Sequence, residues 1–248
     1  MRCSLYLFAA IAALSGCSES TVTWNDVVHR GGPREPSESV RGVAGPSVNG
    51  CGASLRIASN GESSFAAWWA ARRDSSVLLM TARSLRGEAW SNPVVADSTD
   101  RGRRGCGRPP PAIAADPVSR YVHLAYFLEP AGGGVFFAHS MDSGETYHAA
   151  VPIVFGKNPS RTSVASAGDR VVVAYEDPNS EVPLVGVALS RSMGHLFEKR
   201  SLASTEYGRA RQPVVRVDGD SIRVWWSEYS ENPAVSATRP MYRAGRWR

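Results

Sequence analysis

Hydrophobic residues recur along the chain in short runs that end in an aromatic residue. Four runs share this form: Phe65–Trp69, Val122–Tyr126, Val171–Tyr175 and Ile222–Trp226. Successive runs end 57, 49 and 51 residues apart. Apolar runs this short, rich in β-branched and aromatic residues, favour buried β-strands over helices. The pattern therefore predicts an all-β protein built from a repeat of about 50 residues.

Each of these runs is flanked by further strand-length runs within its repeat. The preceding runs are Leu55–Ala58, Ala112–Ala115, Ser163–Ser166 and Val214–Val217. The following runs are Val77–Ala82, Val135–His139, Leu184–Leu189 and, more weakly, Ala234–Thr238. With an outer strand, a repeat holds four strands, which is typical of one antiparallel blade of a β-propeller. We predict four blades; a fifth, degenerate blade is the alternative, because Trp247 stands where an aromatic residue would lead into another outer strand.

The first residues have the pattern of an export signal. Met1-Arg2 supplies a positive start, Leu5–Leu14 is apolar, and Leu14-Ser15-Gly16-Cys17 follows. This ending resembles the bacterial lipobox, which implies removal of residues 1–16 as a signal peptide and attachment of lipid to Cys17. Acyl chains would anchor the protein to a membrane, and Ser18 resembles the pattern of outer-membrane lipoproteins. We expect a lipid-anchored protein of the bacterial cell envelope, with a plain signal peptide as the alternative.

Residues 17–50 have the composition of a tether, because they are rich in Ser, Pro and Gly. Within them, the stretch near residues 22–28 resembles the outer strand of the first repeat, residues 89–95. The last repeat lacks one such strand, so we expect this stretch to complete it and to close the four blades into a ring. The β-propeller domain is predicted to cover residues 51–248 and to be a monomer.

Two cysteines remain once Cys3 is assigned to the signal peptide and Cys17 to the anchor. Cys51 lies six residues before Ile57 and Cys106 seven before Ile113, so both precede the first strand of adjacent repeats. Adjacent blades are neighbours in a propeller, and exported proteins favour disulfides. We predict a Cys51–Cys106 disulfide; a thiol metal site is a weaker alternative because no paired His accompanies the two cysteines.

A polar turn follows the third strand of the second repeat: Ser140-Met141-Asp142-Ser143-Gly144-Glu145-Thr146-Tyr147. Asp142 can accept backbone N–H groups within its own turn, and Gly144 can adopt a positive φ. Ser140 and Thr146 supply hydroxyl groups, and Tyr147 can pack on the strand behind. Looser copies occupy the same place in other repeats, at residues 84–90 and 190–197. The turn resembles the Asp-box, Ser-x-Asp-x-Gly-x-Thr-aromatic, of the sialidase-like β-propellers, and this resemblance implies the same fold.

The repeat register also predicts a ring of charge at the end of the blades opposite these turns. Arginines stand before or at the first strands: Arg56, Arg108, Arg161, Arg209 and Arg211. Charged residues also follow the second strands: Arg72, Glu129, Glu176, Asp177 and Glu228. Both sets of loops emerge at one end because antiparallel strands alternate in direction. The charges either form salt bridges between blades or line a ligand site.

The resemblance to sialidases assigns roles to some of these residues. In that family three arginines hold the sugar carboxylate, a Tyr activated by a Glu is the nucleophile, and the site lies opposite the Asp-boxes. It implies Arg56, Arg161 and Arg211 as the clamp, with Tyr207 as the nucleophile and Glu228 as its partner. The chain departs from the family in its blade count, which is six in sialidases. It also keeps only the Arg-Ile pair of the family's Phe-Arg-Ile-Pro motif, and no loop carries a clear acid/base Asp.

The charge and histidine content of the chain argue against some classes of ligand. The net charge of +5 comes mainly from scattered arginines, and no basic stripe is interleaved with aromatics as in nucleic-acid-binding proteins. The histidines are scattered without metal-ligand spacing: His29, His123, His139, His148 and His195. We therefore expect no nucleic acid, no cofactor and no metal. We favour a lipoprotein whose propeller binds a glycan or another envelope protein without catalysis; the alternative is a sialidase-type exo-glycosidase that acts on an anionic sugar.

Overall fold

The computed structural model describes residues 22–29, 44–61, 63–129, 132–206, 208–229 and 238–248. The predicted signal peptide, Cys17 and Tyr207 lie outside these described residues. Within them the protein is almost entirely β-strand, with one short 3-10 helix, η1 (Gly52–Ser54), so the all-β prediction is confirmed. The described residues contain no helix that is long and apolar enough to cross a membrane.

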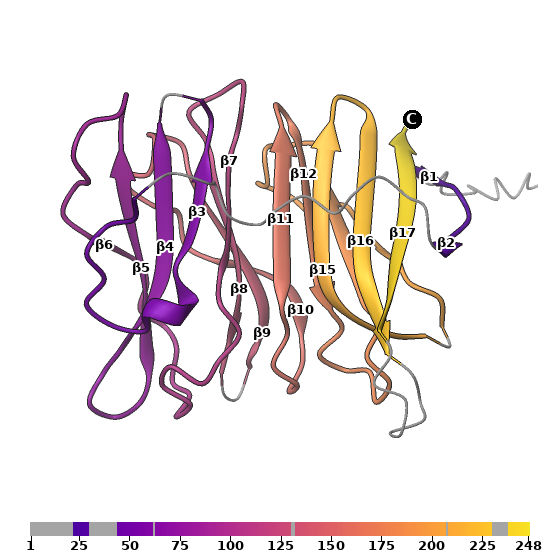
Figure 1. Ribbon diagram of the computed structural model, residues 1–248, viewed down its shortest axis with the longest axis horizontal. Coiled ribbons are helices and arrows are strands. Elements are labelled where there is room, and N and C mark those ends of the chain that lie inside the picture. The colour runs from indigo at the N-terminus through magenta and orange to yellow at the C-terminus, as the bar shows by residue number, and fades with distance from the viewer. Residues whose placement is uncertain (1–21, 30–43, 62, 130–131, 207, 230–237) are drawn as a thin grey trace, which may run out of the picture.

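The strands form four antiparallel sheets, here called blades 1 to 4 (Figure 1). Blade 1 contains β3 (Arg56–Ser59), β4 (Ser64–Ala71), β5 (Val77–Ser84) and β6 (Val94–Asp97). Blade 2 contains β7 (Ala112–Ala115), β8 (Val122–Leu128), β9 (Gly134–Ser140) and β10 (Val151–Phe155). Blade 3 contains β11 (Thr162–Ala167), β12 (Arg170–Glu176), β13 (Val185–Ser190) and β14 (Lys199–Leu202). Blade 4 contains β15 (Arg209–Asp218), β16 (Ser221–Tyr229), β17 (Thr238–Trp247) and β1 (Val22–Trp24), and β2 (Val28–His29) also pairs with β17.

Blade 4 takes its outer strand from the N-terminal part of the chain, as predicted. β1 pairs antiparallel with β17, and Val22 lies opposite Trp247. The prediction for the third strand of this blade was wrong: that strand is β17, whereas residues 234–237 of the expected run lie outside the described residues. Trp24 lies in β1 and therefore belongs to blade 4 rather than to a fifth blade. The described strands therefore make four blades.

The second strands of blades 1, 2 and 3 are buried on both faces. In β4, Trp68 and Trp69 are both almost fully buried although they point to opposite faces of the sheet. Every residue of β8 is buried as well. Burial on both faces explains why these strands are continuous apolar runs rather than alternating ones.

Three hydrophobic clusters hold consecutive blades together. Blades 1 and 2 meet around Trp69, Leu79, Leu124 and Tyr126; blades 2 and 3 around Phe127, Phe137, Ile153 and Val173; blades 3 and 4 around Val187, Leu189, Val224 and Trp226. Full burial of one such side chain contributes about 1.5–3 kcal/mol. Each blade therefore depends on its neighbour for stability.

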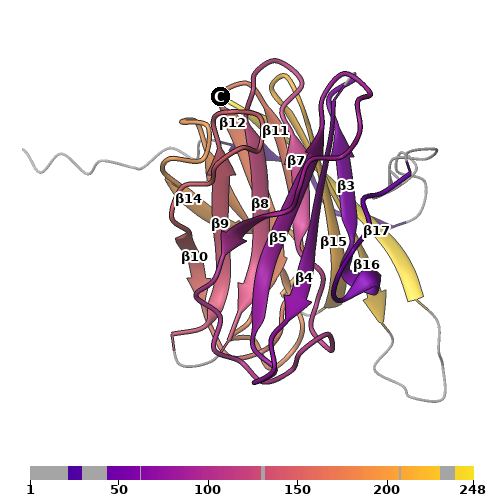
Figure 2. The ribbon, with the colours of Figure 1, turned by 90° about the vertical axis from the view of Figure 1, so that its left-hand side faces the viewer.

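The four blades form an open fan, so the prediction of a closed ring was wrong. Figure 1 shows the sheets side by side in chain order, and Figure 2 looks along the fan from the blade 1 side. Among the described strands, those of blade 1 and blade 4 share at most marginal contact. On the outward face of blade 1, Trp68 packs in a cluster whose described members belong to that blade or to Val48 just before it. Three interfaces among four blades leave the ring open.

A disulfide joins blades 1 and 2, as predicted. Cys51 and Cys106 are bonded, with their Cα atoms 5.2 Å apart. Cys51 precedes β3 and Cys106 precedes β7, so the bond links the entrances to the first strands of two adjacent blades. It crosses 55 residues of sequence, which includes all of blade 1.

The predicted polar turns recur at the other end of the blades, and we call them the serine turns: residues 84–90, 140–147 and 190–197. In the second of them, the Asp142 carboxylate accepts the N–H groups of Glu145 and Thr146 at 3.0 and 2.9 Å and the Thr146 hydroxyl at 2.6 Å. All three turns place two consecutive residues at positive φ, the second a glycine: Arg86-Gly87, Ser143-Gly144 and Met193-Gly194. The internal bracing expected from the sequence is therefore present.

The serine turns also connect the blades. Arg83 of blade 1 donates from Nη1 to the Asp142 carbonyl at 3.2 Å, and Gly144 lies against the Phe65 ring. Gly194 in the turn of blade 3 lies against Phe137 of blade 2 so closely that a Cβ atom has no room there. The serine turns of blades 2 and 3 therefore pack on the preceding blade.

Candidate functional site

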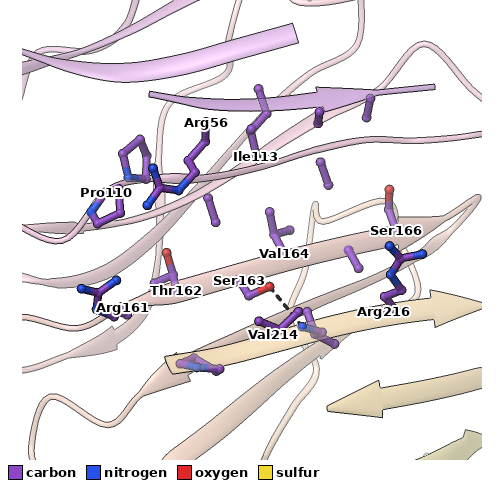
Figure 3. A pocket seen from close by; sticks show the side chains of 18 of the residues that line it. Arg56, Pro110, Ile113, Arg161, Thr162, Ser163, Val164, Ser166, Val214 and Arg216 are labelled. Carbon is purple, nitrogen blue, oxygen red and sulfur yellow. Dashed lines mark hydrogen bonds between the residues drawn. The ribbon is translucent and has the colours of Figure 1, made fainter. Parts of the chain in front are cut away.

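The first strands of the four blades line one cavity of about 740 Å³. The lining is formed by residues 56–59, 110–115, 161–166 and 212–217, which belong to β3, β7, β11 and β15 or lie just before them (Figure 3). These strands meet because each is the innermost strand of its blade. The cavity has the size of a small-ligand site.

The strands around the cavity have unused hydrogen-bonding capacity. Each of β3, β7, β11 and β15 is the end strand of its sheet and pairs with a neighbouring strand on one side only. The other edge of such a strand carries backbone N–H and C=O groups that take no part in its own sheet. Some are used between blades: Val215 N–H of β15 donates to the Ser163 hydroxyl of β11 at 3.1 Å (Figure 3). The remaining edge groups can serve the polar atoms of a ligand.

Three arginines and no carboxylates are found among the described residues that line the cavity. Arg56 donates from Nη1 to the Leu55 carbonyl at 2.8 Å, so part of its guanidinium is held by its own backbone. Arg161 and Arg216 are exposed, and their guanidinium groups have no hydrogen-bond or ion-pair partner among the described residues. The cavity is therefore positively charged and suits an anionic ligand.

The structure separates the residues that the resemblance to sialidases assigned. Arg56 and Arg161 line the cavity, whereas Arg211 and Glu228 do not. Arg211 lies in β15 opposite Ser227, just before a bulge, and is exposed. Glu228 is half-buried and accepts a hydrogen bond from Trp226 Nε1 at 3.4 Å. Tyr207 is outside the described residues, so its role stays a prediction.

Arg216 was not among the predicted site residues, although it lies in a predicted strand. It lies between Val215 and Val217, and the alternation of valine with arginine marks an exposed position. Among the four predicted first strands, only Leu55–Ala58 and Val214–Val217 contain a charged residue. A charged residue in an otherwise apolar first strand is therefore the sequence feature that could have identified Arg216 as a site residue.

Other members of the predicted ring of charge are structural. Arg108 Nη1 and Asp100 Oδ2 form a fully buried ion pair at 2.7 Å. The Arg108 guanidinium also lies 5.5 Å from the centre of the Trp69 ring, and Glu129 N–H donates to the Asp100 carboxylate at 3.0 Å. Breaking a buried pair of this kind is strongly destabilising. Arg108 and Glu129 therefore join blades 1 and 2 rather than line a ligand site.

A cluster of four histidines lies at the opposite end of the blades, at the serine turns. The histidines are scattered along the sequence, but the fold gathers four of them. His123 and His139 face each other across β8 and β9, and His148 N–H donates to the His139 carbonyl at 2.9 Å. The His195 ring, from the serine turn of blade 3, lies 4.5 Å from the His139 ring.

Two members of this cluster, His123 and His139, have a lowered pKa. Burial lowers the pKa of His123 to about 3, since the charged neighbour Asp116 only partly compensates. Burial, with the nearby His195 and His148, lowers the pKa of His139 to about 4. Within the described residues, neither ring nitrogen of His123 has a hydrogen-bond partner. In that same part of the chain, no three His, Cys, Asp or Glu side chains are placed to hold one metal ion.

Comparison with known proteins shows the fold. No protein-family model and no curated protein sequence matches the chain. Among solved structures, a Dyadobacter fermentans protein of unknown function matches with a TM-score of 0.57 at 16% identity, over 78% of this chain and 52% of that chain. A Hadza microbial sialidase matches with a TM-score of 0.52 at 14% identity, over 76% and 43%. A Penicillium chrysogenum alpha-L-arabinanase matches with a TM-score of 0.52 at 16% identity, over 76% and 60%.

These matches identify a class of architecture. The chain has the β-propeller fold found in sialidases and arabinanases, with four blades in an open fan. It spans about half the length of the solved structures it matches. Identities this low show the fold alone, so the activity must be argued from the cavity.

Proposed function

We propose that this protein is a cell-envelope lipoprotein whose propeller blades bind a glycan in the inner-strand cavity without cleaving it. The observation that carries the proposal is the lining, which combines three arginines with free strand edges and small side chains. A concave site of this size suits a sugar chain better than a protein surface. The propeller fold of carbohydrate-active enzymes among the matching structures supports the same ligand class.

The described lining of the cavity lacks the carboxyl groups that glycosidic bond cleavage generally requires. Glycoside hydrolases generally place two carboxyl groups on either side of the scissile bond. The described lining residues include neither Asp nor Glu. Sialidases use a Tyr nucleophile instead, but none of the described tyrosines is hydrogen-bonded to a glutamate: Tyr126, for example, donates to Asp97 at 2.7 Å. A described lining without a carboxyl group or a tyrosine supports binding alone.

A glycan array tests this function. Purified full-chain protein is expected to bind a defined subset of glycans, and Ala58→Trp, which fills the cavity from β3, should abolish that binding. Ala149→Trp places the same ring on an exposed loop and should leave binding intact. Thermal denaturation of both variants checks that they are folded. Equal binding by the wild type and a folded Ala58→Trp variant would place any glycan site elsewhere.

The second candidate function is a sialidase-type exo-glycosidase. It is favoured by Arg56 and Arg161, which line the same cavity as the resemblance implied, and by the Asp-box-like turns at the opposite end. The enzyme would release the fluorophore from a fluorogenic sialoside, and Arg161→Ala would reduce that rate at least tenfold. The proposal of binding without cleavage predicts no release above the rate in buffer.

Envelope attachment rests on the sequence of the first 17 residues. Cys17→Ser should move the protein from the membrane fraction to the soluble fraction of an expressing bacterium, because it removes the acylated side chain. Ser15→Ala, two residues earlier, is the matched control and should keep the protein in the membrane fraction. Unchanged fractionation of Cys17→Ser would refute lipidation at this residue.

A further inference from the structure

The two unpaired arginines of the cavity lie at different levels along its walls. Val215 N–H donates to the Ser163 hydroxyl, which places Val215 of β15 level with Ser163 of β11. A second contact, from Gln212 N–H to Glu176 Oε1 at 2.8 Å, lies at the level where Arg161 precedes β11. The two strands therefore run in the same direction, and Arg161 and Arg216 are about three residues apart along them. At a rise of about 3.3 Å per residue, this offset is on the order of 10 Å.

The two side chains also lie apart. Figure 3 shows the Arg161 and Arg216 guanidinium groups at opposite ends of the cavity, with Val164 and Val214 between them. A guanidinium binds one carboxylate through two parallel hydrogen bonds, which requires direct contact. One small anion therefore cannot satisfy both arginines. A ligand that does so must carry negative charges at two points along its length.

The other residues that line the cavity restrict the chemical class of the ligand. The described lining residues are mostly small or aliphatic. Three of their hydroxyl groups bond within the protein: Ser59 and Thr162 donate to the Ser63 and Ala125 carbonyls, both at 2.8 Å, and Ser163 accepts from Val215 N–H. The described lining includes no aromatic ring, and proteins that bind single-stranded nucleic acids rely on aromatic rings to stack the bases. The free strand edges match a ligand rich in hydroxyl groups. These features favour an acidic sugar chain over a nucleic acid.

We infer that the cavity binds a linear acidic polysaccharide, with one carboxylate-bearing sugar on Arg161 and a later one on Arg216. This inference rests on the proposed glycan-binding function and adds the ligand class and its register. It departs from a sialidase-type clamp, in which several arginines meet on a single carboxylate. Binding through two separate points makes affinity depend on the length of the chain.

Calorimetric titration of the purified full-chain protein with oligogalacturonates of one to six residues tests the length dependence. Affinity is expected to rise at least tenfold between the monomer and the longer oligomers and then to level off. Neutral galactose oligomers of the same lengths are expected to bind at least tenfold more weakly than the acidic ones. A monomer that binds as tightly as the hexamer would overturn the two-point arrangement.

Variants of Arg161 and Arg216 test whether each arginine binds its own carboxylate-bearing sugar. Arg161→Ala and Arg216→Ala should each weaken hexamer binding about tenfold, the usual scale for loss of one charge-assisted contact, and each should remove the dependence on length. Arg161→Lys should recover part of the affinity because it restores the charge without the bidentate geometry. Arg200→Ala, on the exposed outer strand β14 of the same blade as Arg161, is the control and should bind as the wild type.

The outcomes separate this inference from the proposed function. Glycan binding that Ala58→Trp abolishes but neither arginine variant weakens would leave a glycan-binding cavity and overturn the acidic ligand. Tighter binding of single-stranded DNA than of the uronate hexamer, lost in both arginine variants, would also overturn the assignment to a sugar chain. Loss of affinity in both arginine variants together with dependence on length confirms it.

Discussion

At the scale of single residues, Asp142 shows how far one side chain determines local structure. Its carboxylate accepts three hydrogen bonds from Glu145 and Thr146 and one from the Ser140 hydroxyl at 2.7 Å. Partial burial raises the pKa of this carboxyl, but the hydrogen bonds from Thr146, Ser140 and Glu145 outweigh it and lower the pKa to about 2. The spacing of serine, aspartate and glycine was enough to predict this turn, because all of its partners are local.

Asp142→Ala should therefore destabilise the protein by about 2 kcal/mol, the scale of losing several hydrogen bonds to one charged group. Ser192→Ala, at the same position of the third serine turn, removes a neutral hydroxyl and should cost about 1 kcal/mol. Urea denaturation at pH 7 measures both. A lowered pKa means that the Asp142 contribution is present above pH 4 and is lost as the pH falls towards 2. Equal stability of Asp142→Ala and the wild type at pH 7 would contradict this account.

The histidine cluster gives a second prediction at this scale. The unfolded chain binds protons at His123 and His139 near pH 6.5, whereas the folded protein does so only near pH 3 and 4. Stability should therefore be full above pH 7 and should fall between about pH 6.5 and pH 4. His123→Leu removes a buried ring without hydrogen-bond partners and should make the loss of stability between pH 7 and pH 5 smaller. Melting temperatures at the two pH values measure this, and an unchanged difference would contradict it.

At the scale of strands and loops, local contacts join neighbouring blades at both ends of their strands. The serine turns join blade 2 to blade 1 and blade 3 to blade 2, and at the other end the Cys51–Cys106 disulfide and the buried Arg108–Asp100 pair join blades 1 and 2. The disulfide was predictable because both cysteines occupy the same position in adjacent repeats. The ion pair was not, because Asp100 lies in a loop whose path depends on the packing of both blades.

Removal of the disulfide should have a large effect on stability. For a loop of this length, the chain-entropy model gives about 4 kcal/mol, so Cys51→Ala/Cys106→Ala should unfold at much lower urea concentration than the wild type. Dithiothreitol should shift the wild type to the same midpoint and leave the double variant unchanged. A wild-type midpoint that does not respond to dithiothreitol would show that the bond contributes little.

At the scale of the whole molecule, the sequence was enough to predict four antiparallel blades and the strand that β1 adds to blade 4, because these follow from repeats of hydrophobic residues. Ring closure was predicted wrongly, because the angle between neighbouring blades depends on side-chain packing across each interface. The same packing brings Arg216 to the cavity beside Arg161 and leaves Arg211 outside its lining. It also gathers four histidines that are far apart in the sequence. The periodicity of hydrophobic residues predicts the strands. It does not predict a site to which four blades contribute, because such a site depends on how the blades are arranged.

Hydrogen exchange measured with and without the glycan that the protein binds most tightly is the most direct test that the inner strands form the binding site. The account predicts slower exchange of backbone amides in β3, β7, β11 and β15 when the glycan is bound, with no change in the outer strands β6, β10 and β14. Protection confined to the outer strands or to the serine turns would contradict it.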